Sequence, residues 1–323
     1  MFDVRPVWWI TGLLLCLLGL TMLLPAAVDL LSGNPEWSMF LGSGAFVFFV
    51  GAALIGANLH RRPRGLTLRQ TFLAPVVGWS ACAVAAALPF IHWGLSPTDA
   101  LFEAISGVTA TGATVLPHLE RLSPGMLLWR SLLQWLGGAG TLALGVLILP
   151  ALKVGGMQIF RVDTSGRDDP MAVRATRILA GIYVVYAGYT LMLAMLLRLA
   201  GMDAFDAVNH ALTTISCGGF STSNGSIGHW HSANVDWVIL IGMLAGGAPF
   251  AVHLQLLSRN WRQGWANTQL RWYLVLIVAS ALLIAAWLMA MQGAKPLPAL
   301  RHGLFAAASV MTGTGFATRD WAG

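Results

Sequence analysis

The sequence predicts an all-α polytopic membrane protein that contains repeated helix–loop–helix units. Three observations lead to this fold class: the composition, seven long apolar stretches, and a segment that occurs three times. Hydrophobic residues make up 57% of the 323 and charged residues only 10%, against about 25% charged residues in soluble domains. This composition excludes an ordinary soluble domain, and the apolar stretches give the order of the elements.

The apolar stretches predict the membrane spans, because a helix needs about 20 such residues to cross a bilayer. Nine of the nineteen Lys and Arg residues fall in segments 58–69 and 152–177. An excess of positive charge on alternate loops is typical of their cytoplasmic side, so we expect a cytoplasmic N-terminus. Basic charge that sets topology in this way does not indicate a nucleic-acid partner. The expected spanning helices are 7–24, 39–59, 71–92, 127–151, 177–200, 235–257 and 270–292.

Three segments with similar sequences precede apolar stretches or the end of the sequence: 99–115, 206–222 and 302–318. Aligned without gaps, they place Gly112, Gly219 and Gly315 in one column. Ser96 and Pro97 form a helix-start signal before the first segment. A helix from 98 to about 109 rises only about 18 Å, too little to cross a ~30 Å hydrocarbon core. We therefore expect each segment to be a short helix followed by a re-entrant loop.

This pattern predicts four parts of the chain. Residues 1–66 form a two-helix hairpin without such a loop, and 67–152 form the first helix–loop–helix unit. Residues 153–258 form the second unit, and 259–323 an incomplete, truncated third unit.

The re-entrant loops predict a cation site. A helix that ends at membrane depth directs its partially negative C-terminus at whatever lies there. Glycine after it allows backbone oxygens to turn inward, and a ring of such oxygens can replace the hydration shell of potassium. The alternative is that the small residues serve close helix packing, which the threefold repeat disfavours. The candidate potassium ligands are backbone oxygens of Ala110, Thr111, Gly112, Cys217, Gly218, Gly219, Gly313, Thr314 and Gly315.

We expect structural roles for other polar residues in apolar surroundings. Glu103 lies in the first short helix, where we expect it to bind the loop backbone rather than to attract cations. His253 has no titratable partners at helical spacing, which favours an interfacial polar residue over a proton relay. Gln134 lies on a helix beside the proposed pore. The sequence contains no Walker loop, dinucleotide fingerprint, hydrolase motif or paired metal-ligand spacing, so we expect neither an enzyme nor a resident cofactor.

The loop motifs resemble those of the Trk/Ktr/HKT superfamily of potassium transporters, and most closely its TrkH-type bacterial branch. The residues that carry the resemblance are VTATGATV at 108–115, SCGGFSTS at 216–223, TGTGFATRD at 312–320 and RSLLQWLGGAG at 130–140. The resemblance covers the whole chain. It implies a pseudo-fourfold, cation channel-like fold, a homodimer, and a cytoplasmic nucleotide-binding regulatory subunit of the TrkA type.

The resemblance therefore implies potassium uptake across the bacterial inner membrane, with K⁺ as the transported ion. Three alternatives stay open: a sodium-coupled transporter, a less selective cation transporter, and an inert truncated subunit. The sequence does not separate channel-like flow from symport. Because four loops are the usual requirement for a closed ring, we expect the chain to carry three quarters of the filter.

Overall fold

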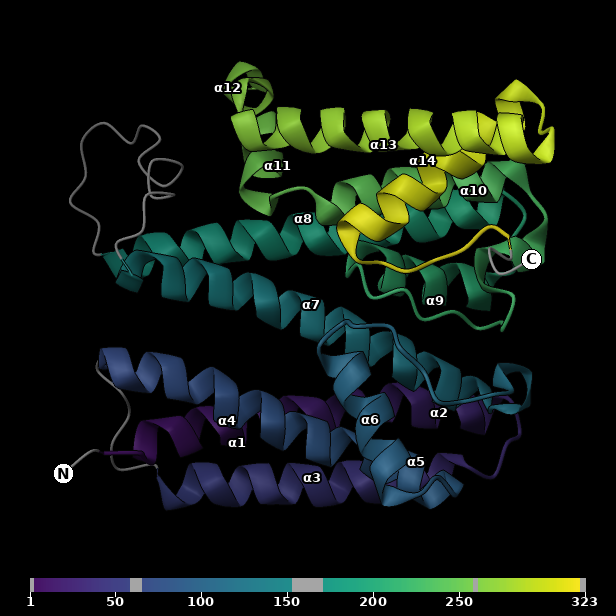
Figure 1. The fold of residues 1–323 in the computed structure, drawn as a ribbon. Coiled ribbons are helices and arrows are strands. Elements are labelled where there is room, and N and C mark those ends of the chain that lie inside the picture. Colours follow the sequence, from purple (N-terminus) through teal and green to yellow (C-terminus); the bar gives the residue numbers. More distant parts are fainter. Residues whose placement is uncertain (1–2, 59–65, 153–170, 258–260, 320–323) are drawn as a thin grey trace.

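The architecture is entirely helical over the residues that the computed structural model describes, 3–58, 66–152, 171–257 and 261–319. Two layers lie on either side of α7, which runs obliquely between them (Figure 1). One buried apolar cluster lies among α1–α7 and a second among α7–α14. The basic segments 59–65 and 153–170, which supported the expected topology, lie outside the described residues.

The first layer contains the N-terminal hairpin and the first short helix. The hairpin consists of α1 (Arg5–Thr21), α2 (Leu23–Leu31) and α3 (Trp37–Ala57). It is followed by α4 (Leu68–Ala86), α5 (Leu88–Trp93), α6 (Pro97–Val108), the 3-10 helix η2 (Leu119–Arg121) and α7 (Pro124–Leu152).

The second layer begins with α8 (Met171–Leu199) and α9 (Ala204–Ile215). The 3-10 helix η4 (Ser226–Trp230), α10 (Ala233–Gly247) and α11 (Phe250–Leu257) follow. The last elements are α12 (Trp261–Ala266), α13 (Thr268–Gln292) and α14 (Pro296–Thr312).

Two pairs of glycines join the helices of the hairpin. Gly12 and Gly19 on α1 face Gly51 and Gly44 on α3, and the backbones touch. A Cβ added at Gly12 would lie 2.7 Å from the Gly51 oxygen, and one at Gly19 would lie 2.7 Å from the Gly44 oxygen. Small residues at such spacing let membrane helices approach closely, so these glycines are packing residues.

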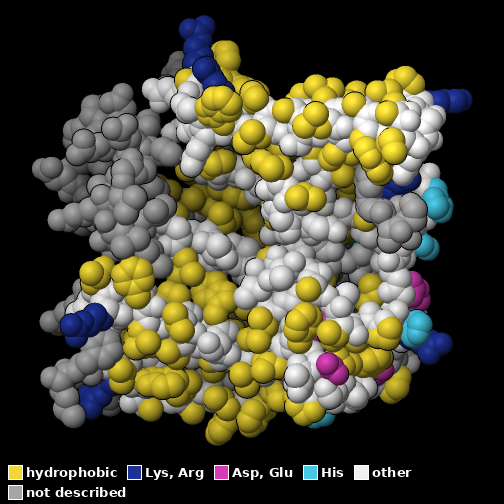
Figure 2. Space-filling view, in the orientation of Figure 1, with side chains coloured by type: hydrophobic (Ala, Val, Ile, Leu, Met, Phe, Trp, Pro, Cys, Tyr) yellow, Lys and Arg dark blue, Asp and Glu magenta, His cyan; other side chains and the backbone are white. Residues whose placement is uncertain are grey.

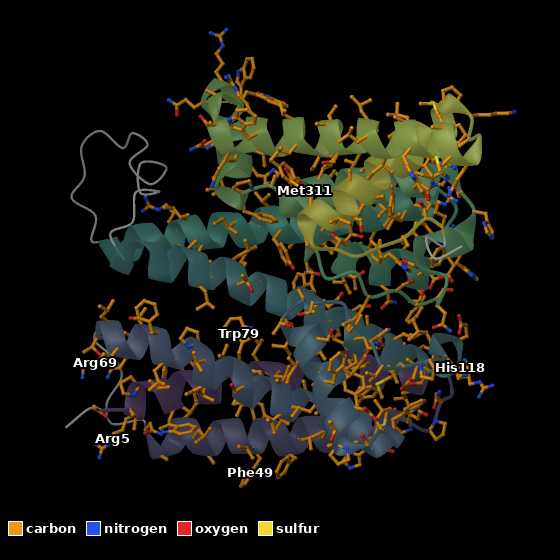
Figure 3. All side chains as sticks on the ribbon, in the orientation of Figure 1. Arg5, Phe49, Arg69, Trp79, His118 and Met311 are labelled. Atoms are coloured by element: carbon orange, nitrogen blue, oxygen red, sulfur yellow. The ribbon has the colours of Figure 1, made fainter. Side chains whose placement is uncertain are left out.

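In the part of the chain that the structure describes, five helical stretches are long and apolar enough to span a membrane: residues 5–31, 37–57, 68–93, 176–199 and 268–292. They agree with five of the seven expected spans. Arg5 and Arg69 lie at one end of the molecule and His118 at the other (Figure 3), while apolar side chains cover much of the surface between (Figure 2). The chain is therefore a multi-pass membrane protein.

The expectation of one continuous helix over 235–257 was wrong. The structure breaks it into α10 and α11, whose axes differ by 102°. Ala248 takes an extended conformation with ψ 149°, as the residue before a proline prefers, and Pro249 has no amide hydrogen to continue the helix. The sixth candidate span is thus a bent pair.

Side chains from neighbouring helices bind the carbonyl oxygens released by this break. The Leu244 oxygen accepts a hydrogen bond from the Tyr273 hydroxyl at 3.3 Å. His253 Nε2 lies 2.9 Å from the Ala245 oxygen, and its Nδ1 lies 3.1 Å from the Tyr189 hydroxyl. Because a carbonyl only accepts, Nε2 carries the hydrogen. His253 is therefore a buried cap of a broken helix rather than an interfacial residue.

Candidate functional site

The short helices α6 and α9 begin at polar caps, as the sequence predicts for α6. The Ser96 hydroxyl accepts a hydrogen bond from the Asp99 amide at 3.2 Å, with Pro97 in the first turn. Asp203 accepts from the Asp206 amide at 2.9 Å. Both caps bind amides that have no partner within the helix, so they fix where each helix starts.

The short helices α6, α9 and α14 also end alike. At the end of α6, the Ala110 amide donates to the Gly107 oxygen and the Thr111 amide to the Ser106 oxygen, both at 2.9 Å. The end of α9 has the same pair of bonds, Cys217 to Thr214 and Gly218 to Thr213. The Gly313 amide donates to the Val310 oxygen at 3.2 Å. The paired bonds at α6 and α9 form a Schellman motif, which requires a left-handed residue after the helix, and α14 shares the first bond of the pair.

Left-handed residues recur at alternate positions in the loops after these helices. We call residues 109–115, 216–222 and 313–318 the first, second and third loop. The column of Gly112, Gly219 and Gly315 has φ of +81°, +76° and +79°. Two residues earlier, φ is +53° at Ala110, +54° at Cys217 and +76° at Gly313. The alternation lets consecutive backbone oxygens face one side of a loop.

The three loops meet at the column glycines. A Cβ added at Gly112 would overlap the Gly218 carbonyl oxygen of the second loop. A Cβ added at Gly219 would overlap the Thr314 carbonyl oxygen of the third loop. A Cβ added at Gly315 would meet no described atom within 4 Å. The loops therefore follow one another around a common centre. In the first two loops, the column glycine lies beside the carbonyl oxygen of the residue that precedes the column glycine of the next loop. The column glycine of the third loop, Gly315, has open space at this point.

The first loop is held by a buried ion pair. Glu103 accepts hydrogen bonds from the Thr114 hydroxyl and, at 3.2 Å, from the Val115 amide. Arg130 of α7 donates its Nε hydrogen to Glu103 Oε1 at 2.8 Å, and both side chains are buried. The expected role of Glu103 at the loop backbone is confirmed. Its arginine partner was not anticipated.

The second loop is held by α7 and by α9. Gln134 donates its amide hydrogen to the Gly218 oxygen at 2.7 Å and accepts from the Phe220 amide at 3.0 Å. Arg130 donates to the Ser221 oxygen at 3.1 Å, and its guanidinium lies 4.0 Å from the centre of the Phe220 ring. His210 Nε2 lies 2.9 Å from the Ser221 hydroxyl. The Gly218 oxygen is thus already hydrogen-bonded.

The third loop is held by contacts of a different kind. The Ser309 hydroxyl of α14 donates to the Phe316 oxygen at 2.8 Å. The Ala317 amide donates to the Ser226 hydroxyl at 3.2 Å, and the Ala317 oxygen accepts from the Gly228 amide at 3.0 Å. The three loops share one backbone conformation, yet their supports differ.

A glycine pair in α7 lies directly against the ends of two short helices. A Cβ at Gly137 would overlap the Val108 oxygen at the end of α6. A Cβ at Gly138 would lie 3.0 Å from the Ser216 Cβ at the end of α9 and 2.7 Å from the Tyr186 hydroxyl. Tyr186 itself donates to the Trp135 oxygen of α7 at 2.9 Å.

A second glycine pair, in α10, repeats this arrangement. A Cβ at Gly246 would lie 2.8 Å from the Ile215 oxygen at the end of α9. A Cβ at Gly247 would lie 2.6 Å from Thr312 Cγ2 at the end of α14 and 2.8 Å from the Tyr273 hydroxyl. The structure therefore equates Gly137–Gly138 with Gly246–Gly247, a repeat that the loop alignment did not reveal.

The chemistry available at this site is that of backbone oxygens. Among the described residues, no group of three or more His, Cys, Asp or Glu side chains could hold a metal ion. Of the expected ligand residues, the structure brings Gly112 beside Gly218 and Gly219 beside Thr314. Arg130 and Gln134 were not predicted as supports. The signal was present, because two polar residues four apart in an otherwise apolar span indicate a functional face.

Helices long and apolar enough to span a membrane, together with shorter helices whose loops meet, define a polytopic membrane protein. Comparison with known proteins identifies the family. A family model described as "TrkH: Cation transport protein" matches residues 38–323, and the chain belongs to this family.

Relatives support the assignment over nearly the whole chain. The Trk system potassium uptake protein TrkH of Halomonas elongata is 33% identical over 99% of this chain and 67% of its own length. The protein of that name from Escherichia coli is 36% identical over 97% of this chain and 66% of its own. The crystal structure of the potassium transporter TrkH from Vibrio parahaemolyticus has a TM-score of 0.89 at 32% identity, covering 99% of this chain and 67% of that one. The chain spans about two thirds of the length of these relatives.

Proposed function

We propose that this chain contributes to potassium uptake through a pathway lined by backbone oxygens of the three loops. The observation that carries the proposal is the shared alternation of left-handed residues in loops that meet around one centre. Such loops offer several carbonyl oxygens to one cation, which replaces its hydration shell without a charged side chain. The relatives named as potassium uptake proteins give the same ion.

A closed ring of oxygens requires a fourth loop, and its place lies between Gly315 and Thr111. Gly112 packs against the Gly218 oxygen, and Gly219 packs against the Thr314 oxygen. A Cβ added at Gly315 would meet no described atom within 4 Å. We propose that a loop outside these 323 residues supplies that oxygen. In this arrangement the helix–loop–helix units are 67–152 and 153–258, residues 259–323 belong to a third, and 1–66 is a leading hairpin.

The test is ion flux in liposomes that contain the purified full-length gene product. Potassium and rubidium influx at least about tenfold faster than sodium influx is the expected result, since each factor of ten corresponds to about 1.4 kcal/mol of discrimination. Equal sodium and potassium flux overturns the selectivity. Absence of any cation flux from a folded, monodisperse protein overturns the transport function.

A less selective cation pathway, including a sodium-coupled one, is the second candidate. The observation in its favour is the open space beside Gly315, where no described atom completes a ring of oxygens. Competition between potassium and sodium in the same liposomes separates the two candidates.

The surroundings of the chain are part of the proposal. We propose a bacterial inner-membrane location with the N-terminus in the cytoplasm, a homodimer, and a cytoplasmic nucleotide-binding regulatory partner of the TrkA type. Reporter fusions at the N-terminus and after residue 92 test the orientation, because the two fusions must report opposite sides. Light scattering of the detergent-solubilised protein tests the dimer.

A further inference from the structure

One face of α7 binds the second loop through two polar side chains. Arg130 and Gln134 lie four residues apart, on the same side of the helix. Arg130 donates to the Ser221 oxygen, and Gln134 binds the Gly218 oxygen and the Phe220 amide. Gln134 is fully buried and spans the backbone on both sides of the column glycine.

The glycine pairs identify the equivalent face of α10. Gly137 and Gly246 each lie against the last carbonyl oxygen of the short helix that precedes them in the chain. The offset between them is 246 − 137 = 109 residues. Applied to Arg130 and Gln134, it gives positions 239 and 243, which are Ile239 and Met243.

This face of α10 is apolar where that of α7 is polar. Ile239 and Met243 are both fully buried, in the cluster that also contains Phe316 of the third loop. Methionine and glutamine have similar length and volume, so the two positions differ chiefly in hydrogen bonding. The chain therefore holds the second loop with a polar side chain on α7, and the equivalent position of α10 carries a buried thioether.

We propose that Gln134 is a positioning residue that fixes the geometry of the second loop and so contributes to the ion preference of the site. The proposal rests on the potassium function proposed above. Gln134 uses its side-chain NH₂ group as a donor and its side-chain oxygen as an acceptor, toward atoms two residues apart in the loop. A loop tied at both points resists the inward shift of its oxygens that a smaller cation requires.

The hydrogen bond also changes the ligand itself. A carbonyl oxygen that accepts from an amide offers the cation one lone pair fewer than a free carbonyl. The Gly218 oxygen therefore differs from the aligned oxygens of Thr111 and Thr314, although the loop backbones are alike. Removal of the Gln134 amide frees this oxygen and loosens the loop at the same time.

The experiment compares ion preference in four variants of the full-length gene product in liposomes. Gln134→Met places at this position the residue that its equivalent in α10 carries, so packing volume is kept. Gln134→Glu keeps the acceptor for the Phe220 amide and, when ionised, loses the donor. Met243→Gln adds an amide on the equivalent face. Ser131→Ala is the matched control, since among the described residues the Ser131 hydroxyl donates to the Leu127 oxygen of its own helix and not to a loop.

The expected result is a potassium-to-sodium flux ratio about five- to tenfold lower in Gln134→Met and in Gln134→Glu, the change that one lost buried hydrogen bond produces. Ser131→Ala and Met243→Gln keep at least half of the wild-type ratio. An unchanged ratio in either folded Gln134 variant overturns the proposal, as does an equal drop in Ser131→Ala. If Gln134→Met is not monodisperse, Gln134→Glu alone decides. A wild-type protein without ion preference contradicts the proposed function instead, so the two failures are distinguishable.

Discussion

Glycine is used in the N-terminal hairpin and in the three loops for different physical reasons. In the hairpin, Gly19 and Gly44 have ordinary helical backbones, and each lies against the other's helix. In the loops, Gly112 and Gly219 have positive φ and also lie against a carbonyl oxygen of the next loop. The hairpin requires a small residue, whereas the loops require both a small residue and a left-handed conformation.

This difference in backbone conformation predicts different effects of a glycine substitution in the hairpin and in the loops, which the sequence pattern alone does not distinguish. A Cβ in the hairpin pushes two helices apart, which lowers stability far from any ion pathway. A Cβ in a loop forces a left-handed residue and displaces an oxygen that we propose to bind potassium. The predictions below compare effects on ion flux with effects on stability, from the largest expected effect on ion flux to the smallest.

Gly219→Ala is expected to have the largest effect on transport. Alanine at φ +76° costs about 1–2 kcal/mol, and its Cβ overlaps the Thr314 oxygen as well. We expect potassium influx into liposomes to fall at least about tenfold, which corresponds to about 1.4 kcal/mol, with a smaller change in melting temperature. Gly112→Ala is expected to behave in the same way, because it overlaps the Gly218 oxygen.

Gly315→Ala is the informative control for this prediction. Its φ of +79° gives the same backbone strain, but its added Cβ meets no described atom within 4 Å. A loss of flux as large as that of Gly219→Ala indicates that a fourth loop lies beside Gly315. If all three variants keep wild-type flux in folded protein, the loops are packing elements like the hairpin.

Glu103→Gln is expected to act on stability more than on ion preference. The change leaves Arg130 buried and without its ionic partner, and breaking a buried pair in this way typically costs 3–5 kcal/mol. Thermal unfolding of the purified protein measures the cost. Combining Glu103→Gln with Arg130→Met restores part of the loss, whereas purely additive effects contradict a coupled pair.

Much of the fold followed from composition and spacing, and the exceptions have identifiable causes. Five spans were correctly predicted because hydropathy over about 20 residues is a local property. The break between α10 and α11 was missed because Gly246, Gly247 and Ala248 keep the segment apolar. Pro249 and the glycines before it nevertheless indicate a helix end.

The candidate site was predictable only in its local part. The column of Gly112, Gly219 and Gly315 could be aligned because helix ends and loop conformation depend on neighbouring residues. The bonds from Arg130 and Gln134 to the second loop join residues more than 80 positions apart. No spacing rule connects such residues, so only the packed structure shows that the polar face of α7 holds the loops.

Gly51→Ala tests the hairpin side of the comparison. The new Cβ would lie 2.7 Å from the Gly12 oxygen and 2.8 Å from the Cys16 amide, so α1 and α3 must separate. We expect a loss of about 1–3 kcal/mol in stability, seen as a lower melting temperature, with an unchanged potassium-to-sodium flux ratio. Gly42→Ala in the same helix is the control, because its Cβ meets no atom within 4 Å. A changed flux ratio in Gly51→Ala would remove the distinction between the two sets of glycines.

Glu120→Gln is expected to have the smallest effect, in the connections that follow the first and second loops. Glu120 accepts from the Asn224 amide at 3.1 Å and from its side-chain amide at 2.8 Å. Hydrogen bonds from its own backbone amide and that of Asn224 lower the pKa of Glu120 below its ordinary 4.5. A carboxyl group with a lowered pKa stabilises the folded protein at pH values above its ordinary pKa. This stabilisation is lost as the pH falls through the lowered pKa.

The melting temperature of wild type should therefore exceed that of Glu120→Gln by a small, constant amount near neutral pH, because Glu120 is exposed. The difference should shrink as the pH falls below 4.5. A difference that stays constant down to pH 3 contradicts a role for the carboxylate charge. A constant difference would mean that the contact between Glu120 and Asn224, like the glycine packing in the hairpin, stabilises the protein independently of protonation.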